Sequence, residues 1–118
     1  MKVWIDGSGW NGKECGYCVA FEDGYTYAEK FSENHTNNEM EYEALLSLLR
    51  GTSIIEGDEI FTDSLLVVNQ VNEKWKVREP RLFPLCQEAQ NLMKIRKVSL
   101  NWIPREENKA GHLIEKRR

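Results

Sequence analysis

Acidic side chains stand at positions where a folded sheet would gather them. Asp6 ends one short β-rich run of the chain, and Asp63 follows another. In open α/β sheets ligands bind beyond the carboxyl ends of the strands, so the two aspartates converge if their strands are parallel neighbours. A helical stretch offers Glu39, Glu41 and Glu43, of which one could reach the same edge. Grouped carboxylates repel one another and imply a compensating cation, and oxygen ligands favour hard ions such as Mg²⁺ or Mn²⁺.

A second pattern with possible chemistry is the C-x-x-C formed by Cys15 and Cys18. A zinc site needs a further Cys or His pair at close spacing, but Cys86 is distant and His35 stands alone. The pattern also enters a strand instead of opening a helix, unlike a redox motif. We expect both cysteines to pack in the interior, and the odd total of three favours a reducing cytosol over a disulfide-linked fold.

Hydrophobic periodicity predicts the elements that position these side chains. An Asp-Gly pair at 23–24 indicates a hairpin. The expected strands cover residues 2–6, 16–22, 25–31, 59–62 and 98–103, and the expected helices cover 39–50, 65–71, a segment from Pro80–Pro84 to about 93, and 105–118. This order predicts an α/β domain in which an antiparallel hairpin extends the sheet and helices cover its faces.

Length and composition favour one globular domain spanning residues 1–118. Hydrophobic residues make up 41% and charged residues 30%, which excludes a disordered chain. No apolar run is long enough for a membrane-spanning helix or a signal peptide. The net charge of −3 combines −9 for residues 1–63 with +6 for residues 64–118. Such asymmetry fits an acidic site beside a basic face, although solvated faces of different sign account for it equally well.

Four segments make the sequence recognisable: VWIDGSG, HTNNEMEYEALLSLL, IFTDSLLVVNQV and NWIPREENKAG. In order and spacing they resemble the type 1 ribonuclease H family over nearly the whole chain. The resemblance implies a ribonuclease-H-like fold, with a five-stranded mixed sheet flanked by helices. It also implies hydrolysis of the RNA strand of RNA–DNA hybrids with two divalent metal ions, Mg²⁺ or Mn²⁺.

The resemblance assigns the catalytic, metal-binding carboxylates residue by residue. The first catalytic Asp of the family matches Asp6, and its next Asp matches Asp63. Its catalytic Glu lies three residues after the second Asn of the TNN motif, which selects Glu41 over its two neighbours.

A fourth carboxylate, usual in the final helix of the family, is missing. In the family this carboxylate lies about ten residues after the tryptophan of the last strand, and the same count from Trp102 leads to His112. Either His112 or Asn108 could take the catalytic position and ligate or position a metal, with Asn108 the harder oxygen ligand. Glu107 or Glu115 could swing in instead, and His112 could equally be a plain surface histidine.

Polar side chains before the first helix are candidates for substrate binding. The amides of Asn37 and Asn38 can both donate and accept, which suits a hybrid minor groove marked by 2′-hydroxyls, and in the family Thr36 falls where a DNA phosphate is held. One of the two asparagines could also cap the helix. The neighbours of the strand-end aspartates, Gly7 and Ser64, complete the expected contacts.

The tryptophans divide into two groups. Trp75 lies among lysines and arginines, a mixture that suits a groove following a nucleic-acid backbone, although it could equally anchor the core beneath those cations. Trp10, in the loop after Asp6, could approach substrate. Trp4 and Trp102 lie in predicted strands, and we expect both in the core.

The resemblance implies a metal-dependent endonuclease that leaves 5′-phosphate ends and whose partner is an RNA–DNA hybrid. We expect a cytoplasmic monomer without a membrane partner. The alternative is a weak or inactive ribonuclease-H-like domain that only holds nucleic acid.

Overall fold

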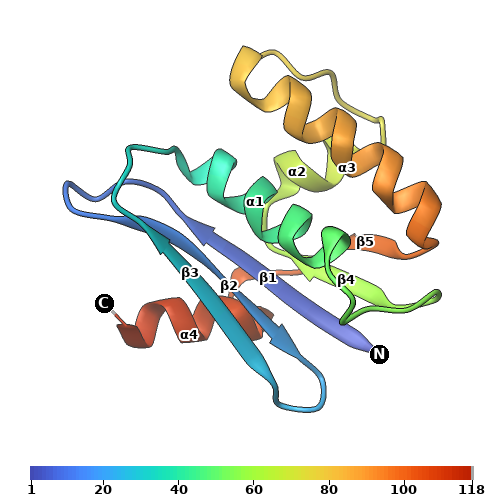
Figure 1. Cartoon of the computed structure of the whole chain (residues 1–118), viewed down its shortest axis with the longest axis horizontal. Helices are drawn as coiled ribbons and strands as arrows, with labels where there is room; N and C mark the ends of the chain where they lie inside the picture. Colours follow the sequence, from blue (N-terminus) through green and yellow to red (C-terminus); the bar gives the residue numbers. More distant parts are fainter. Residues whose placement is uncertain (118) are drawn as a thin grey trace.

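The computed structural model describes the backbone of residues 1–117 and the side chains of residues 1–113. Its sheet has the strand order β3-β2-β1-β4-β5 (Figure 1). The strands are β1 (Lys2–Ser8), β2 (Cys15–Phe21), β3 (Thr26–Phe31), β4 (Glu59–Thr62) and β5 (Ser99–Trp102). The first three are antiparallel, whereas β4 pairs in parallel with both β1 and β5. The five-stranded mixed sheet expected from the sequence is therefore confirmed.

The helices are α1 (Asn37–Arg50), α2 (Leu65–Val71), α3 (Phe83–Arg96) and α4 (Lys109–Arg117), with short 3₁₀ turns η1 (Pro80–Leu82) and η2 (Arg105–Glu107). Helices α1, α2 and α3 lie on one face of the sheet, and α4 lies alone on the other (Figure 1). Because strand side chains alternate between faces, Val3 and Ile5 of β1 enter the large core under α1. Trp4 packs with Cys18, Ala20 and Ala110 under α4.

Helix α1 begins two residues earlier than the hydrophobic pattern predicted. The Thr36 hydroxyl accepts the Glu39 backbone N–H at 3.1 Å, and the Glu39 carboxylate accepts the Thr36 N–H at 3.0 Å. This capping box ends the polar loop at Thr36. The cap is therefore Thr36, and both Asn37 and Asn38 are helical residues.

The last predicted helix, 105–118, is wrong at its start. Residues Arg105–Glu107 form a 3₁₀ turn, and α4 begins only at Lys109. The side-chain oxygen of Asn108 accepts the Ala110 N–H at 3.0 Å and so caps α4. Residue 118 of that prediction lies outside the described residues.

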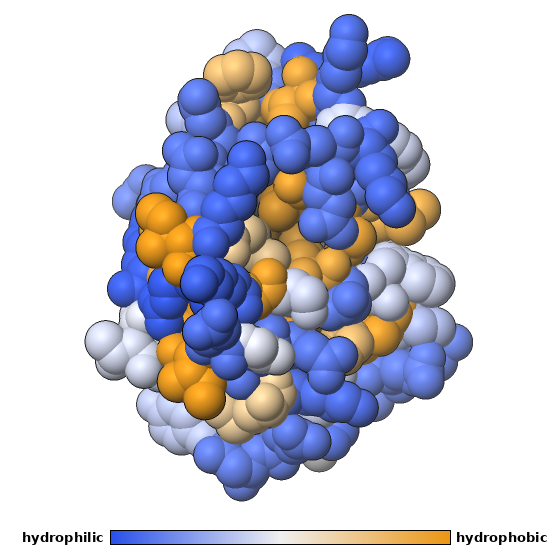
Figure 2. All heavy atoms as spheres, turned by 90° about the vertical axis from the view of Figure 1, so that its right-hand side faces the viewer, coloured by the Kyte–Doolittle hydropathy of each residue, from blue (hydrophilic) through white to orange (hydrophobic). Residues whose placement is uncertain are grey.

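The surface is mostly hydrophilic, as Figure 2 shows for the face at the right-hand side of Figure 1, where apolar side chains show inside a hollow. None of the helices in the described part of the chain is long and apolar enough to cross a bilayer.

Candidate active site

Three carboxylates from distant parts of the chain meet at one edge of the sheet. Asp6, Glu41 and Asp63 each place an oxygen within 4.8 Å of the others. Asp6 lies within β1, two residues beyond Trp4, where the parallel pairing with β4 ends. Asp63 directly follows β4. The convergence expected for two parallel neighbouring strands is therefore present in the structure.

Glu41 joins this group because α1 crosses β1 at a glycine. A Cβ atom on Gly7 would lie 2.4 Å from the backbone nitrogen of Glu41, so no larger residue fits beneath the helix. The Gly7 N–H donates to Glu41 Oε1 at 3.0 Å, and the Thr62 hydroxyl donates to Oε2 at 3.3 Å. Gly7, expected as a substrate contact, thus packs against α1 and holds the carboxylate.

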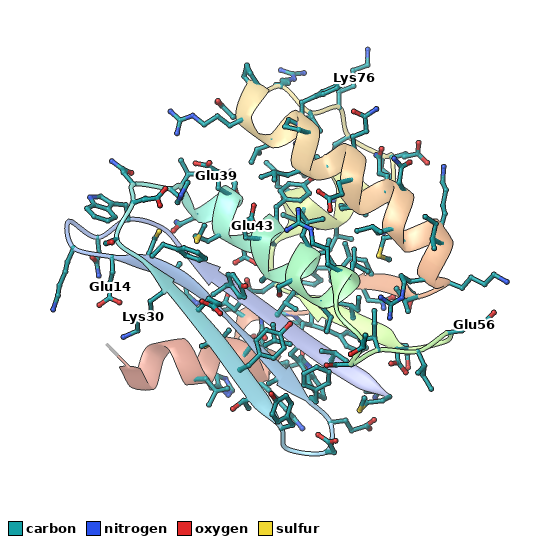
Figure 3. The ribbon with its side chains drawn as sticks, in the orientation of Figure 1. Glu14, Lys30, Glu39, Glu43, Glu56 and Lys76 are labelled. Carbon is teal, nitrogen blue, oxygen red and sulfur yellow. The ribbon has the colours of Figure 1, made fainter. Side chains whose placement is uncertain are left out.

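The other two glutamates of α1 do not reach the group. Glu39 and Glu43 are labelled on α1 in Figure 3. The Glu39 carboxylate belongs to the capping box and also lies 3.4 Å from Arg81. The Glu43 carboxylate lies 4.0 Å from Arg50. The three glutamates therefore have separate partners, and only Glu41, 7% exposed, faces the two aspartates.

The site is strongly acidic. Burial raises the pKa of Glu41 well above its usual value, and the charge of Asp6 raises it further. Burial also raises the pKa of Asp6, with a contribution from Asp63 that the charge of Arg105 partly offsets. Desolvated, mutually repelling carboxylates with oxygen donors fit a hard divalent cation better than any other common ligand.

Asn108 is fully buried beside this group and links α4 to it. Its amide nitrogen donates to the Ile5 carbonyl at 2.9 Å and to Asp63 Oδ2 at 3.2 Å. Its amide oxygen accepts the N–H groups of Ala110 and Gly111 at 3.0 and 3.4 Å. These partners fix the orientation of the amide, because the Ile5 carbonyl and Asp63 Oδ2 are both acceptors and must face the NH₂ group. Asn108 therefore positions Asp63 through its nitrogen, which differs from the expected role as an oxygen ligand.

The fourth acidic position of the family has no ligand here among the described side chains. In α4, Gly111 lies close to the group, since a Cβ on it would lie 3.3 Å from Asp6 Oδ2. Successive helix residues are about 100° apart, so His112 turns away from Asp6, is exposed and is not in the group. Glu107 is exposed in η2, and the Glu115 side chain lies outside the described residues.

The predicted substrate residues lie at the start of α1, in a neighbouring groove and at the start of α2. Thr36 and Asn37 are exposed, and Asn37 Oδ1 accepts the Gly9 N–H, which ties the β1–β2 loop to α1. Asn38 and Trp75 line a groove of about 580 Å³. The other lining residues are Leu66, Gln70, Lys74, Lys76, Arg78, Glu79 and Leu82. Trp75 is 48% exposed and is thus not a core anchor. The Ser64 hydroxyl caps α2 by accepting the Val67 N–H at 3.2 Å.

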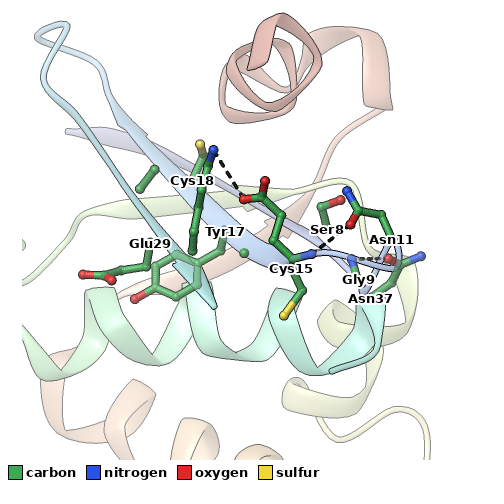
Figure 4. Close-up of a pocket in the computed structure, with 12 residues that line it drawn as sticks. Ser8, Gly9, Asn11, Cys15, Tyr17, Cys18, Glu29 and Asn37 are labelled. Atoms are coloured by element: carbon green, nitrogen blue, oxygen red, sulfur yellow. Dashed lines mark hydrogen bonds and ion pairs between the residues drawn. The ribbon is translucent and has the colours of Figure 1, made fainter. Parts of the chain in front are cut away.

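The two cysteines of the C-x-x-C pattern point to opposite sides of β2 (Figure 4). Cys15 donates to the Glu33 carbonyl at 3.1 Å, and Cys18 packs with the cluster under α4. Both are buried and both line a groove of about 600 Å³ beside the β1–β2 loop. Since they face apart, they cannot bind one metal together, as expected from the sequence.

Two residues near the site were missed. Trp102 was expected in the core, but its side chain is 48% exposed and its indole N–H donates to the Asp63 carbonyl at 3.2 Å. Trp4, by contrast, is buried as expected. Arg105 is the cation whose charge acts on Asp6. Its position in the short segment between the last strand and the Asn-capped helix is the signal that could have identified it.

The fold and the acidic group together define a ribonuclease-H-like protein. The profile of the family described as "Reverse transcriptase-like" matches residues 24–117. The chain belongs to this family, and the sequence resemblance to type 1 ribonuclease H is confirmed.

Similar proteins agree with this assignment. Bifunctional protein Rv2228c of Mycobacterium tuberculosis is 37% identical over 76 residues, which cover 62% of this chain but only 21% of that protein. The chain thus spans about a fifth of the length of this relative. The solved N-terminal RNase H domain of Rv2228c has a TM-score of 0.73 at 26% identity and covers 99% of this chain and 98% of its own.

Two further solved structures share the fold. LC11-RNase H1 in complex with an RNA/DNA hybrid has a TM-score of 0.72 at 29% identity, covering 92% of this chain and 88% of that one. RNase H1 of the archaeon Halobacterium salinarum has a TM-score of 0.77 at 23% identity, covering 95% and 91%, and shows likeness of fold alone.

Proposed function

We propose that this protein is a metal-dependent endonuclease that hydrolyses the RNA strand of RNA–DNA hybrids. The observation that carries the proposal is the group of three buried or half-buried carboxylates at the sheet edge, beside a groove lined by an amide, a tryptophan and cations. A similar fold has been solved with an RNA/DNA hybrid bound. We also propose that the protein acts as a monomer in the cytoplasm, which size-exclusion chromatography and cell fractionation would test.

The carboxylates would hold two Mg²⁺ or Mn²⁺ ions. Such ions activate a water molecule and stabilise the leaving 3′ oxygen in phosphodiester hydrolysis. In our proposal the carboxylates of Asp6, Asp63 and Glu41 would be the ligands that hold these ions. Water adds to phosphorus and the P–O3′ bond breaks, so the products carry a 5′-phosphate and a 3′-hydroxyl.

The remaining residues position these groups and the substrate. Gly7 and Thr62 hold the Glu41 carboxylate by hydrogen bonds, and Asn108 holds Asp63. In our proposal Asn37 and Asn38 contact the minor groove, where 2′-hydroxyls distinguish RNA from DNA. Trp75 with its neighbouring cations would follow the backbone and sugars of the substrate.

The decisive experiment compares cleavage of labelled RNA–DNA hybrid, duplex RNA and duplex DNA in Mg²⁺, Mn²⁺ or EDTA. We expect hybrid cleavage that requires metal and produces 5′-phosphates. Asp63→Asn should abolish cleavage while the fold and hybrid affinity are kept, because Asn108 can still hydrogen-bond to the amide oxygen. Full activity of Asp63→Asn in Mg²⁺ would contradict the two-metal proposal.

A binding domain without activity is the second candidate. It is favoured by the lack of a fourth carboxylate in the acidic group among the described side chains, since Gly111 faces Asp6 and His112 is exposed. Hybrid binding with no turnover in either metal would support it. Metal-dependent turnover that is lost in Asp63→Asn would exclude it.

A further inference from the structure

An exposed tryptophan adjoins the acidic group, outside the groove of Trp75. Trp102 is the last residue of β5 and pairs with Thr62 of β4, the residue whose hydroxyl holds Glu41. Leu100, two residues earlier on the same face of the strand, is only 4% exposed, whereas Trp102 is 48% exposed. The helices on this face therefore cover β5 at Leu100 but leave its carboxyl end open.

The Trp102 ring is fixed in this exposed position. Its indole N–H donates to the backbone carbonyl of Asp63 at 3.2 Å, so the ring is attached to the segment that carries a catalytic carboxylate. Leu65, two residues after Asp63 and the first residue of α2, is 49% exposed. Two large, exposed apolar side chains thus adjoin Asp63, one bonded to its carbonyl and one two residues along the chain.

The chemistry open to this ring is limited. Its single donor is already used, so what Trp102 can offer to a ligand is an apolar, π-rich surface. Base faces and sugars are the parts of a nucleic acid that pack on such a surface, and stacking tolerates any base because every base has a π-face. A phosphate held by cations at the carboxylates would have its adjoining nucleotides near Asp63, and the ring bonded to the Asp63 carbonyl lies within their reach.

We propose that Trp102, with Leu65 beside it, is a substrate contact that packs against the nucleotide next to the scissile phosphate. This inference rests on the proposed function and extends it, because the contact places the strand without reading its sequence and without binding metal. Trp102 therefore contributes to substrate affinity and to the choice of the cleaved bond, while Asp63 contributes to the chemical step.

The test compares wild type, Trp102→Ala, Trp102→Phe and Ile55→Ala in cleavage of an end-labelled hybrid. Ile55 is a matched control because it is 72% exposed in the loop before β4, at the strand end opposite the acidic group. We expect Trp102→Ala to raise KM about 5- to 100-fold, the range for loss of one stacked base, with kcat changed much less. Trp102→Phe keeps an aromatic face and should restore most of the affinity, and Ile55→Ala should behave as wild type.

Three results would overturn this inference while the proposed function stands: an unchanged KM in a folded Trp102→Ala, equal rises for the Ala and Phe variants, or an equal rise for Ile55→Ala. Equal Ala and Phe effects would point to the N–H bond with Asp63 and not to the ring. If neither the wild type nor any variant cleaves hybrid, the proposed function is wrong, and the Trp102 contact is tested by binding alone. Titration with hybrid should then quench the tryptophan fluorescence of the wild type more than that of Trp102→Phe, and equal quenching would contradict the contact.

Discussion

Replacing Glu41 by glutamine should make the metal-free protein more stable while it destroys activity. Glu41 is 7% exposed, and one of its carboxylate oxygens lies within 4.8 Å of an oxygen of Asp6 and of Asp63. At that distance one like-charge pair costs about 3.5 kcal/mol for an effective dielectric constant of 20. The folded wild type avoids part of this cost by binding a proton, because burial raises the pKa of Glu41. Glutamine keeps an oxygen for the Gly7 N–H, so we expect a net gain of about 1–3 kcal/mol.

The pH dependence of this gain has a definite sign. An acid whose pKa is raised by folding contributes its full stability below its unfolded pKa, about 4.3 for glutamate, and loses it as the pH rises through the folded-state pKa. The difference between Glu41→Gln and wild type should therefore be small at pH 4 and grow towards neutral pH. In EDTA at pH 7 the Tm of Glu41→Gln should exceed that of wild type by about 4–12 °C.

Thermal unfolding in EDTA and in Mg²⁺, followed by circular dichroism from pH 4 to 8, measures this effect. Mg²⁺ should stabilise wild type, by about 2.7 kcal/mol at a hundred times Kd, and so remove most or all of the advantage of Glu41→Gln. Glu43→Gln is the matched control, because Glu43 lies on the same helix near Arg50 and outside the acidic group. A Glu41→Gln protein no more stable than wild type at pH 7, or a gain independent of pH, would refute the reasoning. Equal activity losses for Glu41→Gln and Glu43→Gln would refute the register argument.

Two further comparisons follow from the structure. Asn108→Ala removes a helix cap and leaves the Ile5 carbonyl without its donor, so it should cost about 1–3 kcal/mol and lower activity 10- to 100-fold. His112→Ala should change the free energy of unfolding by no more than about 0.5 kcal/mol and keep activity in both Mg²⁺ and Mn²⁺. A larger loss of activity than that of Asn108→Ala would instead favour His112 as the metal ligand. Glu73→Gly should raise the Tm by about 2–4 °C, because Glu73 has a φ of 62°, which only glycine adopts without strain. Glu73→Ala, which keeps the Cβ, should give no such gain.

The arrangement of the strands could be predicted because the signals were local. The Asp23-Gly24 pair marks the hairpin, and in the structure Gly24 has a φ of 95°, as the tight turn requires. The helical period of residues 40–48 likewise reflects burial of one face of α1. Starts of helices were less accurate, because the capping side chains of Thr36 and Asn108 precede any periodic pattern.

The exposure of Trp102 could not be derived from its strand. Periodicity assigns Leu100 and Trp102 to one face, but it does not tell how far along the strand the covering helices extend. Here they cover Leu100 and end before Trp102. The same holds for His112: the spacing along the chain predicted it beside the carboxylates, whereas in the structure Gly111, one residue earlier, lies next to Asp6.

The three carboxylates of the site repel one another, and hydrogen bonds from the surrounding fold hold them in place despite this repulsion. The Gly7 N–H donates to the Glu41 carboxylate, and the Trp102 indole N–H donates to the Asp63 carbonyl. The Asn108 amide donates both to the Ile5 carbonyl and to the Asp63 carboxylate. None of these contacts neutralises the carboxylates; the Gly7 and Asn108 bonds orient the Glu41 and Asp63 carboxylates, and the Trp102 and Ile5 bonds fix the backbone and amide around them. Repelling groups that were free to move would separate and lose the geometry for a cation, whereas groups fixed in this way keep their repulsion until a cation arrives. The fold therefore stores unfavourable charge at this edge, and binding of a divalent ion would relieve it.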